Sequence, residues 1–185
     1  MNTFDIEKYF VVNDTNIDLS YLPMLLRRKL SRIDKLAFTV LSKIFDEEID
    51  EIVFSSKNGE FERLKEIITQ YQSENMVSPI KFSASVHNFS VGAFAQLNKF
   101  TGPYYAISAG DESFGNGLIT AIIQNNKRVC YCYADEIGIG LVIEASDKYI
   151  LSPSEEKSDT IDDFLLFMDG KREFWQSGNG VIIKK

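Results

Sequence analysis

The 185-residue chain has 27 acidic residues against 20 lysines and arginines, a formal net charge of −7, which argues against nucleic acid as its main partner. No apolar run approaches the roughly 20 residues that span a bilayer, and the amino terminus lacks the pattern of a secretory signal. The composition is that of an ordinary globular protein, so we expect one cytoplasmic domain over residues 1–185.

The first part of the chain alternates between strand and helix patterns. We predict a strand over 4–12 and an amphipathic helix that begins after Ser31, which has the side chain of an N-cap. A short apolar strand over 49–56 follows, and a turn leads into a second helix over 60–72. One face of this second helix is apolar: Leu64, Ile67, Ile68 and Tyr71.

The middle of the chain contains a strand, a sharp turn and a helix in direct succession. The strand covers 104–108, directly after Gly102-Pro103, and the helix covers 113–125. Enzymes often mount a nucleophile at such a strand-to-helix elbow. Here the tip holds Asp111 and no cysteine. Because helix dipoles favour carboxylates at their amino ends, Asp111 is interpreted as the cap of the helix.

The last third of the chain contains further strand and helix patterns. We predict strands over 129–134 and 140–145, then an exposed acidic loop over 152–163 and a helix whose apolar side includes Phe164. A turn and a terminal edge strand complete the chain over 178–185. This alternation of strands and helices predicts an α/β domain with helices on the faces of a sheet.

The two cysteines, Cys130 and Cys132, stand two residues apart in one predicted strand. Side chains at this spacing lie on the same face of a strand and are poorly placed for a disulfide. We therefore interpret both as buried, reduced structural residues. A metal site would need further ligands of the His or Cys type, and the chain has a single histidine. We expect neither a metal nor a cofactor.

A set of residues around the elbow occurs in a recognisable order. Asn88 is followed by Gly92, then by Gly102-Pro103, an apolar strand and the turn over 109–113. This order resembles the amino-terminal half of the ketoacyl synthases, in which the turn carries the catalytic cysteine. The resemblance implies half of a thiolase-like fold, with a mixed central sheet flanked by helices.

Shorter motifs resemble one branch of these proteins. They are LLRRKLSR at 25–32, FSSKNGE at 54–60, SP at 78–79 with FS at 82–83, SVHN at 85–88 and YADE at 133–136. Together they resemble the short, chain-length-factor-type ketosynthase-like proteins of aryl polyene and flexirubin pigment pathways. The resemblance covers about residues 20 to 140, and residues 146–185 carry no motif of it.

The departures from the family pattern bear on activity. Condensing members use a cysteine in this half and two histidines from a carboxyl-terminal half, which the sequence does not contain. Counted from Gly102-Pro103, the cysteine position falls on Asp111, to within one residue. A carboxylate is a much poorer acyl acceptor than a thiolate. The resemblance therefore implies that this chain alone has no condensing activity. It implies instead a partner that pairs with an active ketosynthase and shapes the acyl tunnel of that enzyme.

The resemblance also assigns roles to residues of the elbow region. The strand before the elbow lies at the two-fold interface of ketosynthase-like dimers, which implies interface roles for Tyr104, Tyr105 and Ile107. Tunnel and elbow positions are implied for Gly110, Phe114 and Gly117. These roles fit a heterodimer with an active ketosynthase or a self-dimer.

A cluster of basic residues stands out in an acidic chain and includes Arg27, Arg28 and Arg32. A local basic patch steers an acidic partner even when the net charge is negative. Acyl carrier proteins are acidic, so one interpretation is a carrier-docking surface. The alternative is a solvated helix face.

Two other functions remain open from the sequence. The first is a small acyl-thioester hydrolase or transferase that uses Ser113 or Asp111 with His87 as the base. The turn over 111–115 misses the G-x-S-x-G pattern by one residue, because Asp111 stands at its first glycine. In the other interpretation His87 serves structure or a subunit contact. The second function is a homodimeric module that binds acyl groups or carrier proteins without chemistry.

Overall fold

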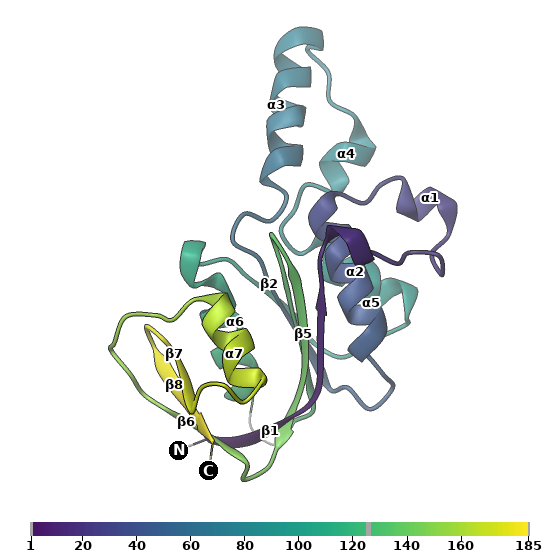
Figure 1. The fold of residues 1–185 in the computed structure, drawn as a ribbon. Helices are drawn as coiled ribbons and strands as arrows, with labels where there is room; N and C mark the ends of the chain where they lie inside the picture. The colour runs from purple at the N-terminus through teal and green to yellow at the C-terminus, as the bar shows by residue number, and fades with distance from the viewer. Residues whose placement is uncertain (1, 125–126, 185) are drawn as a thin grey trace.

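The computed structural model describes residues 2–124 and 127–184, and its centre is a mixed sheet in the order β3-β2-β4-β5-β1-β6-β8-β7 (Figure 1). The strands are β1 Asn2–Val12, β2 Glu51–Ser55, β3 Tyr104–Ile107, β4 Val129–Ala134, β5 Gly138–Ala145, β6 Tyr149–Ser152, β7 Phe174–Ser177 and β8 Gly180–Lys184. The helices are α1 Met24–Arg27, α2 Arg32–Ile44, α3 Phe61–Glu74, α4 Pro79–Ser83, α5 Phe89–Leu97, α6 Ser113–Ile122 and α7 Ile161–Met168, with 3₁₀ turns η1 Asp14–Asn16 and η2 Gly110–Glu112.

The direction of the strands determines where loops converge. β2 runs parallel to its neighbours β3 and β4, whereas β5 runs antiparallel to β4 and β1. The carboxyl ends of β2, β3 and β4 therefore meet at one edge of the sheet. In open α/β sheets this edge is where ligand sites form. The α/β fold predicted from the sequence, with a mixed sheet flanked by helices, is confirmed.

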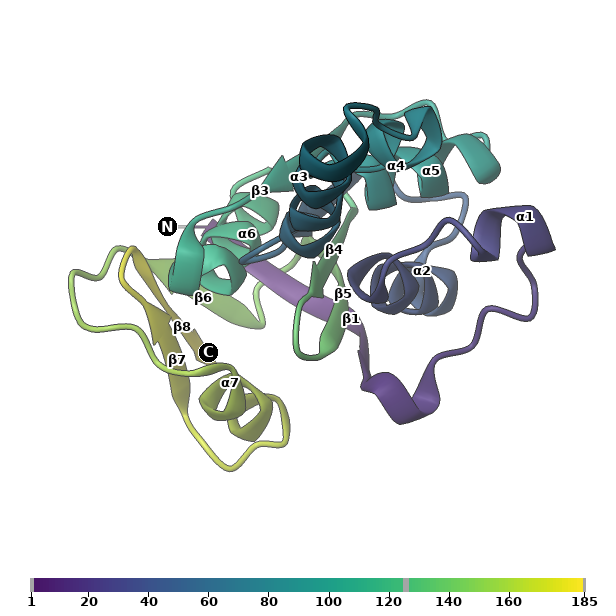
Figure 2. The same cartoon turned by 90° about the horizontal axis from the view of Figure 1, so that it is seen from above.

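Helices cover both faces of the sheet (Figures 1 and 2). α2 and α5 pack on one face, and α6 packs on the other together with α7. α2 forms as predicted: its apolar residues recur at helical spacing and are buried, and Ser31 and Asp34 form a capping box at its start. No helix within residues 2–124 and 127–184 has the length and apolar character needed to cross a membrane.

The strand β4 is buried on both faces, which explains its uninterrupted apolar sequence. Cys130 and Cys132 face the α2 side, and Tyr131 and Tyr133 face the α6 side. Both cysteines are free and fully buried, as predicted. Burial raises the pKa of both thiols.

The carboxyl-terminal segment curves around α6 (Figure 1). β6, β8 and β7 continue the sheet beyond β1, and α7 packs beside them, so that Phe164 and Trp175 bury the side of α6 that carries Phe114. The expectation of a terminal edge strand is wrong in one respect: β8 lies between β6 and β7, and β7 is at the edge. Asn125 and Lys185, the last residues of two predicted elements, lie outside the described residues.

Candidate functional site: the elbow cleft

The elbow is a tight turn held by one hydroxyl group. Gly110 has φ +58°, in the left-handed region that favours glycine. The Ser113 hydroxyl accepts a hydrogen bond from Ala109 N at 2.8 Å and donates one to Gly110 O at 2.7 Å. These bonds close the turn from β3 into α6, and the Ser113 side chain is buried there.

Asp111 does not cap α6, contrary to the interpretation from the sequence. The 3₁₀ turn η2 precedes the helix, whose N-cap position is Glu112 without a side-chain cap. The turn directs the Asp111 side chain outward, where it is 85% exposed and pairs with Lys57. Hydrogen bonding to Asp111 raises the pKa of Lys57.

A cleft of about 550 Å³ opens beside the elbow, at the carboxyl ends of β2 and β4. Its walls come from the start of α2, the β2–α3 loop, the β4–β5 turn, the elbow and the carboxyl-terminal segment. Phe114, Tyr133 and Trp175 contribute aromatic lining. Most of the charged lining is acidic: Glu60, Glu62, Asp111, Glu112, Asp135, Glu136, Asp159 and Asp162, against Arg32, Lys57 and Arg63. The cleft therefore disfavours anionic ligands.

Asp135 fixes the β2–α3 loop, which forms one wall of the cleft. Its carboxylate accepts hydrogen bonds from the Ser56 hydroxyl and from the backbone N–H groups of Lys57 and Asn58. The carboxylate is buried, so these three donors replace the water that it would otherwise bind. No local pattern in the sequence indicates this role of Asp135, because its partners lie 77 to 79 residues earlier in the chain.

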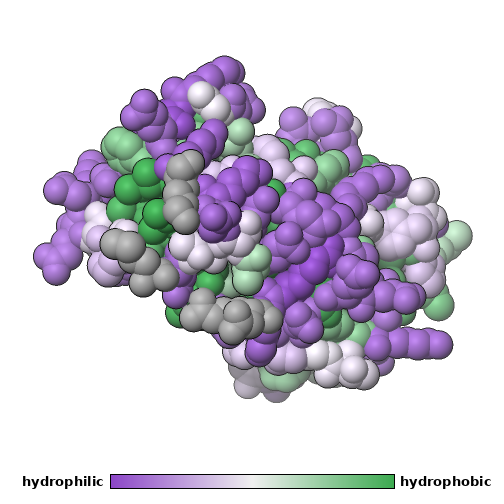
Figure 3. Space-filling view, turned by 90° about the horizontal axis from the view of Figure 1, so that it is seen from below, coloured by the Kyte–Doolittle hydropathy of each residue, from purple (hydrophilic) through white to green (hydrophobic). Residues whose placement is uncertain are grey.

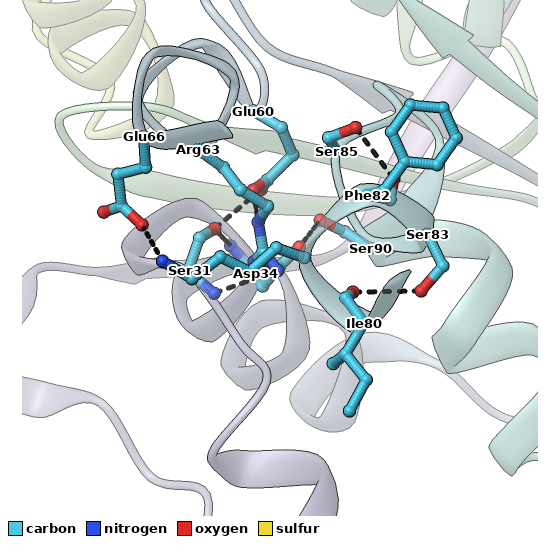
Figure 4. A network of polar contacts seen from close by, with 11 residues as sticks. Ser31, Asp34, Glu60, Arg63, Glu66, Ile80, Phe82, Ser83, Ser85 and Ser90 are labelled. Carbon is cyan, nitrogen blue, oxygen red and sulfur yellow. Dashed lines mark hydrogen bonds and ion pairs between the residues drawn. The ribbon is translucent and has the colours of Figure 1, made fainter. Parts of the chain in front are cut away.

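A buried network of charged groups joins α2, α3 and α5 next to the cleft (Figure 4). Asp34 accepts hydrogen bonds from Ser90 Oγ at 2.5 Å and Arg63 Nη2 at 2.9 Å. Arg63 also donates through Nε to Glu60 at 2.5 Å, and Ser31 Oγ donates to Glu60 at 2.6 Å. Burial, followed by the nearby Asp34 charge, raises the pKa of Glu60. One guanidinium thus holds two carboxylates in place.

The His87 side chain is hydrogen-bonded to the backbone next to the elbow. Its Nε2 bonds to Ile107 O at 3.0 Å, at the end of β3, and its ring packs against Phe54. Gly59, with φ +50°, leaves room for the ring, because a Cβ there would lie 2.2 Å from Nδ1. Neither His87 nor Ser113 is among the described residues that line the cleft. The structure commits these two side chains to separate backbone partners.

Comparison with known proteins places this elbow in a family. A family model described as the beta-ketoacyl synthase N-terminal domain matches residues 3–137. The chain belongs to this family. The resemblance seen in the sequence is therefore confirmed, and its match begins closer to the amino terminus than the motifs did.

Two solved structures share the fold of this ketoacyl synthase domain. One is the ketosynthase ApeO in complex with its chain length factor ApeC from Xenorhabdus doucetiae. The match has 23% sequence identity and a TM-score of 0.76, and it covers 100% of this chain and 100% of the matched chain in that complex. The other is the ishigamide ketosynthase/chain length factor, with 17% identity and a TM-score of 0.56. It matches 73% of this chain, which spans 51% of that one. No curated protein sequence matches.

Of the residues expected at tunnel and elbow positions in a ketoacyl synthase fold, Phe114 and Gly117 lie in packed surroundings and Gly110 does not. Phe114 is buried against Phe164, Tyr133 and Trp175, with ring centroids 4.9 to 5.5 Å away. A Cβ at Gly117 would lie 2.6 Å from Ser55 Oγ, so this glycine allows α6 to approach β2 closely. Phe114 lines the cleft, whereas Gly110 faces open space.

The strand expected at a dimer interface is at the edge of the sheet. Within the described residues, β3 pairs through its backbone with β2 alone. Tyr104 and Tyr105 are 39% and 40% exposed, and Ile107 is half-buried. An exposed edge strand with aromatic side chains is a ready surface for another chain.

The basic residues separate into two places. Arg27 and Arg28 are exposed on and beside the short helix α1. Arg32 instead donates to Asp135 O at 2.6 Å and Glu136 O at 2.9 Å, and pairs with Asp14. Arg32 therefore closes one side of the cleft. Within residues 2–124 and 127–184, no group of three His, Cys, Asp or Glu side chains is arranged to hold a metal ion.

Proposed function

We propose that this chain is a non-catalytic, chain-length-factor-type subunit that pairs with an active ketosynthase in type II fatty-acid or polyketide biosynthesis of a polyene pigment. The observation that carries the proposal is Asp111. Counted from Gly102-Pro103, Asp111 falls within one residue of the position of the family's cysteine on the elbow, and its exposed carboxylate pairs with Lys57.

The chemistry of the cysteines supports a non-catalytic role. Acyl transfer in condensing enzymes needs a thiolate, because the thiolate is the nucleophile. Cys130 and Cys132 lie under α2, and burial raises the pKa of both thiols. Neither replaces the cysteine that the elbow lacks. A carboxylate at the Asp111 position is a weak acyl acceptor.

The free edge of β3 supports pairing with a second subunit. Tyr104 and Tyr105 give that edge aromatic surface, which interfaces favour. The two structural relatives are named as a ketosynthase with its chain length factor, which agrees with a ketosynthase as the partner. In this proposal Arg27 and Arg28 guide an acidic acyl carrier protein to the complex.

The hydrolase alternative gains no support from the site. Nucleophilic catalysis by a serine needs a base within hydrogen-bonding reach of the hydroxyl group. The Ser113 hydroxyl is engaged with Ala109 N and Gly110 O, whereas His87 bonds to Ile107 O. Ser113 is buried as well.

The experiment that tests the proposed function is a mild affinity purification of the tagged chain from its native host, followed by quantitative mass spectrometry. We expect a ketosynthase that carries the catalytic cysteine, in a one-to-one ratio with the chain. Recovery of the chain alone, or only as a self-dimer, would contradict the proposal. A tagged protein of similar size and charge from the same host serves as the control for carry-over.

A further inference from the structure

The helix α3 projects beyond the sheet and carries an exposed apolar stripe (Figure 1). Phe61, Leu64, Ile68 and Tyr71, here called the α3 stripe, are 49%, 43%, 48% and 57% exposed. Ile67, on the adjoining side of the helix, is buried. Four large apolar side chains in a row on one exposed helix indicate a surface that another molecule covers.

The spacing within the stripe indicates what kind of surface covers it. Its members are three, four and three residues apart, which places them along one seam of the helix. Apolar residues at this spacing pack against a second helix by inserting between that helix's side chains. The natural occupant of the stripe is therefore a helix.

The stripe faces the side of the molecule that carries the elbow and β3. On the other side of α3, Glu66 binds Lys81, and Gln70 Oε1 accepts from Ser78 N next to α4. At about 100° per residue, these two positions point away from the stripe. Figures 1 and 2 both place α4 on one side of α3 and α6 on the other, and Figure 2 places β3 on the α6 side.

The size of the stripe indicates that it belongs to a larger interface. Half-exposed side chains of this size offer roughly 100 Å² each, or about 400 Å² in all. A stable interface covers about 800 Å² on each partner, so the stripe alone is too small. The exposed edge of β3 can supply the remainder. The face opposite α3 is mostly hydrophilic, with apolar groups in separate areas (Figure 3).

We propose that the α3 stripe packs against a helix of the same ketosynthase that pairs along β3. This inference rests on the proposed function and adds a second contact to it. In the complex, the projecting helix α3 lies against the partner on the side of the molecule that carries the elbow. The partner then contacts Tyr104 and Tyr105 through a strand, and Leu64 and Ile68 through a helix.

The test measures the affinity of chain variants for the ketosynthase that copurifies with the chain. Leu64→Glu and Ile68→Glu are each expected to weaken binding at least tenfold, and the double variant to abolish it, because each places a charge in an apolar seam. Thr69→Glu is the matched control: it adds the same charge to an exposed position of α3 away from the stripe, and its affinity should stay within twofold. Circular dichroism and thermal melting should match wild type for all four proteins.

Each other outcome is decisive. Wild-type affinity in both stripe variants overturns the inference and leaves the proposed function standing. If no ketosynthase binds the wild-type chain, the proposed function fails and this inference fails with it. If light scattering shows a homodimer of the chain that the stripe variants dissociate, with no change in affinity for the ketosynthase, the occupant is a second copy and the inference is wrong.

Discussion

The Lys57 ammonium group binds the Asp111 carboxylate beside the elbow cleft. The two residues come from the β2–α3 loop and from η2, so the pair joins the ends of two parallel strands. It places a positive charge next to the tip of the elbow. Both side chains are largely exposed, so solvent screens the pair and its contribution to stability is small.

Replacing Asp111 by cysteine provides a chemical test of this position. The introduced thiol would lie at an exposed site beside Lys57, and a neighbouring cation lowers a thiol pKa. We expect iodoacetamide to modify it rapidly at neutral pH, while Cys130 and Cys132 react only after denaturation. Peptide mass spectrometry over a time course measures the three rates. Equal rates in the folded protein would contradict the described burial.

The close approach of α6 to the sheet predicts a cost for Gly117→Ala. The added methyl group would lie 2.6 Å from Ser55 Oγ and 2.7 Å from Tyr131 Cε2, in a buried region. We expect a loss of about 1–3 kcal/mol in the free energy of unfolding in urea, as for other overpacked cores. Gly110→Ala is the comparison, since no atom lies within 4 Å of its added Cβ and only backbone strain opposes it.

The buried network predicts that loss of the Arg63 guanidinium strongly destabilises the fold. Arg63→Met leaves the Asp34 and Glu60 carboxylates without their cation, next to one another. Breaking a buried pair in this way costs about 3–5 kcal/mol. Urea unfolding measures the loss, and Lys65→Met, at an exposed pair on the same helix, should change little. A small effect of Arg63→Met would show that water reaches the network.

The raised pKa of Glu60 predicts how stability depends on pH. As pH rises from about 4, the unfolded chain releases this proton first, because its carboxyl has the ordinary pKa. The folded chain retains the proton over that interval, so this group favours unfolding increasingly until pH passes the raised folded-state pKa. The stability of Glu60→Gln relative to wild type should therefore rise between about pH 4 and 7. An unchanged difference across that range would contradict the shift.

The exposed edge of β3 predicts a variant that affects assembly without affecting the fold. Tyr105→Lys places a charge on the unpaired edge, a substitution by which edge strands avoid pairing. We expect an unchanged melting temperature, since Tyr105 is 40% exposed, and at least tenfold weaker binding of the copurified ketosynthase. Surface plasmon resonance measures the affinity. Unchanged binding would exclude β3 as the contact.

The elements with a long, regular pattern could be predicted from the sequence. α2 has six apolar positions at helical spacing and a capping serine, so local information determines it. β6 and β7 were missed because four residues carry too little pattern, and their pairing depends on partners far along the chain. The same limit applied to β8, whose position between β6 and β7 could not be known without β7.

The site was predicted in part. The elbow and Asp111 follow from local order, but Lys57 lies 54 residues from Asp111, and no local signal joins them. The cap interpretation of Asp111 failed because a 3₁₀ turn inserts ahead of α6. The α3 stripe illustrates a general ambiguity. Helical spacing of apolar residues predicts a buried face, and it is the same whether the chain itself or another molecule covers that face.

The position of β5 has a consequence for the boundaries of an autonomous folding unit. The family match ends at residue 137, and β5 begins at Gly138. Yet β5 lies between β4 and β1 and pairs with both along most of its length. A fragment that ends where the family match ends would split the sheet, separate β1 from the rest and uncover the strand that holds both cysteines. The family match and the folding unit therefore end at different residues in this chain. A truncated variant should retain all residues through β8.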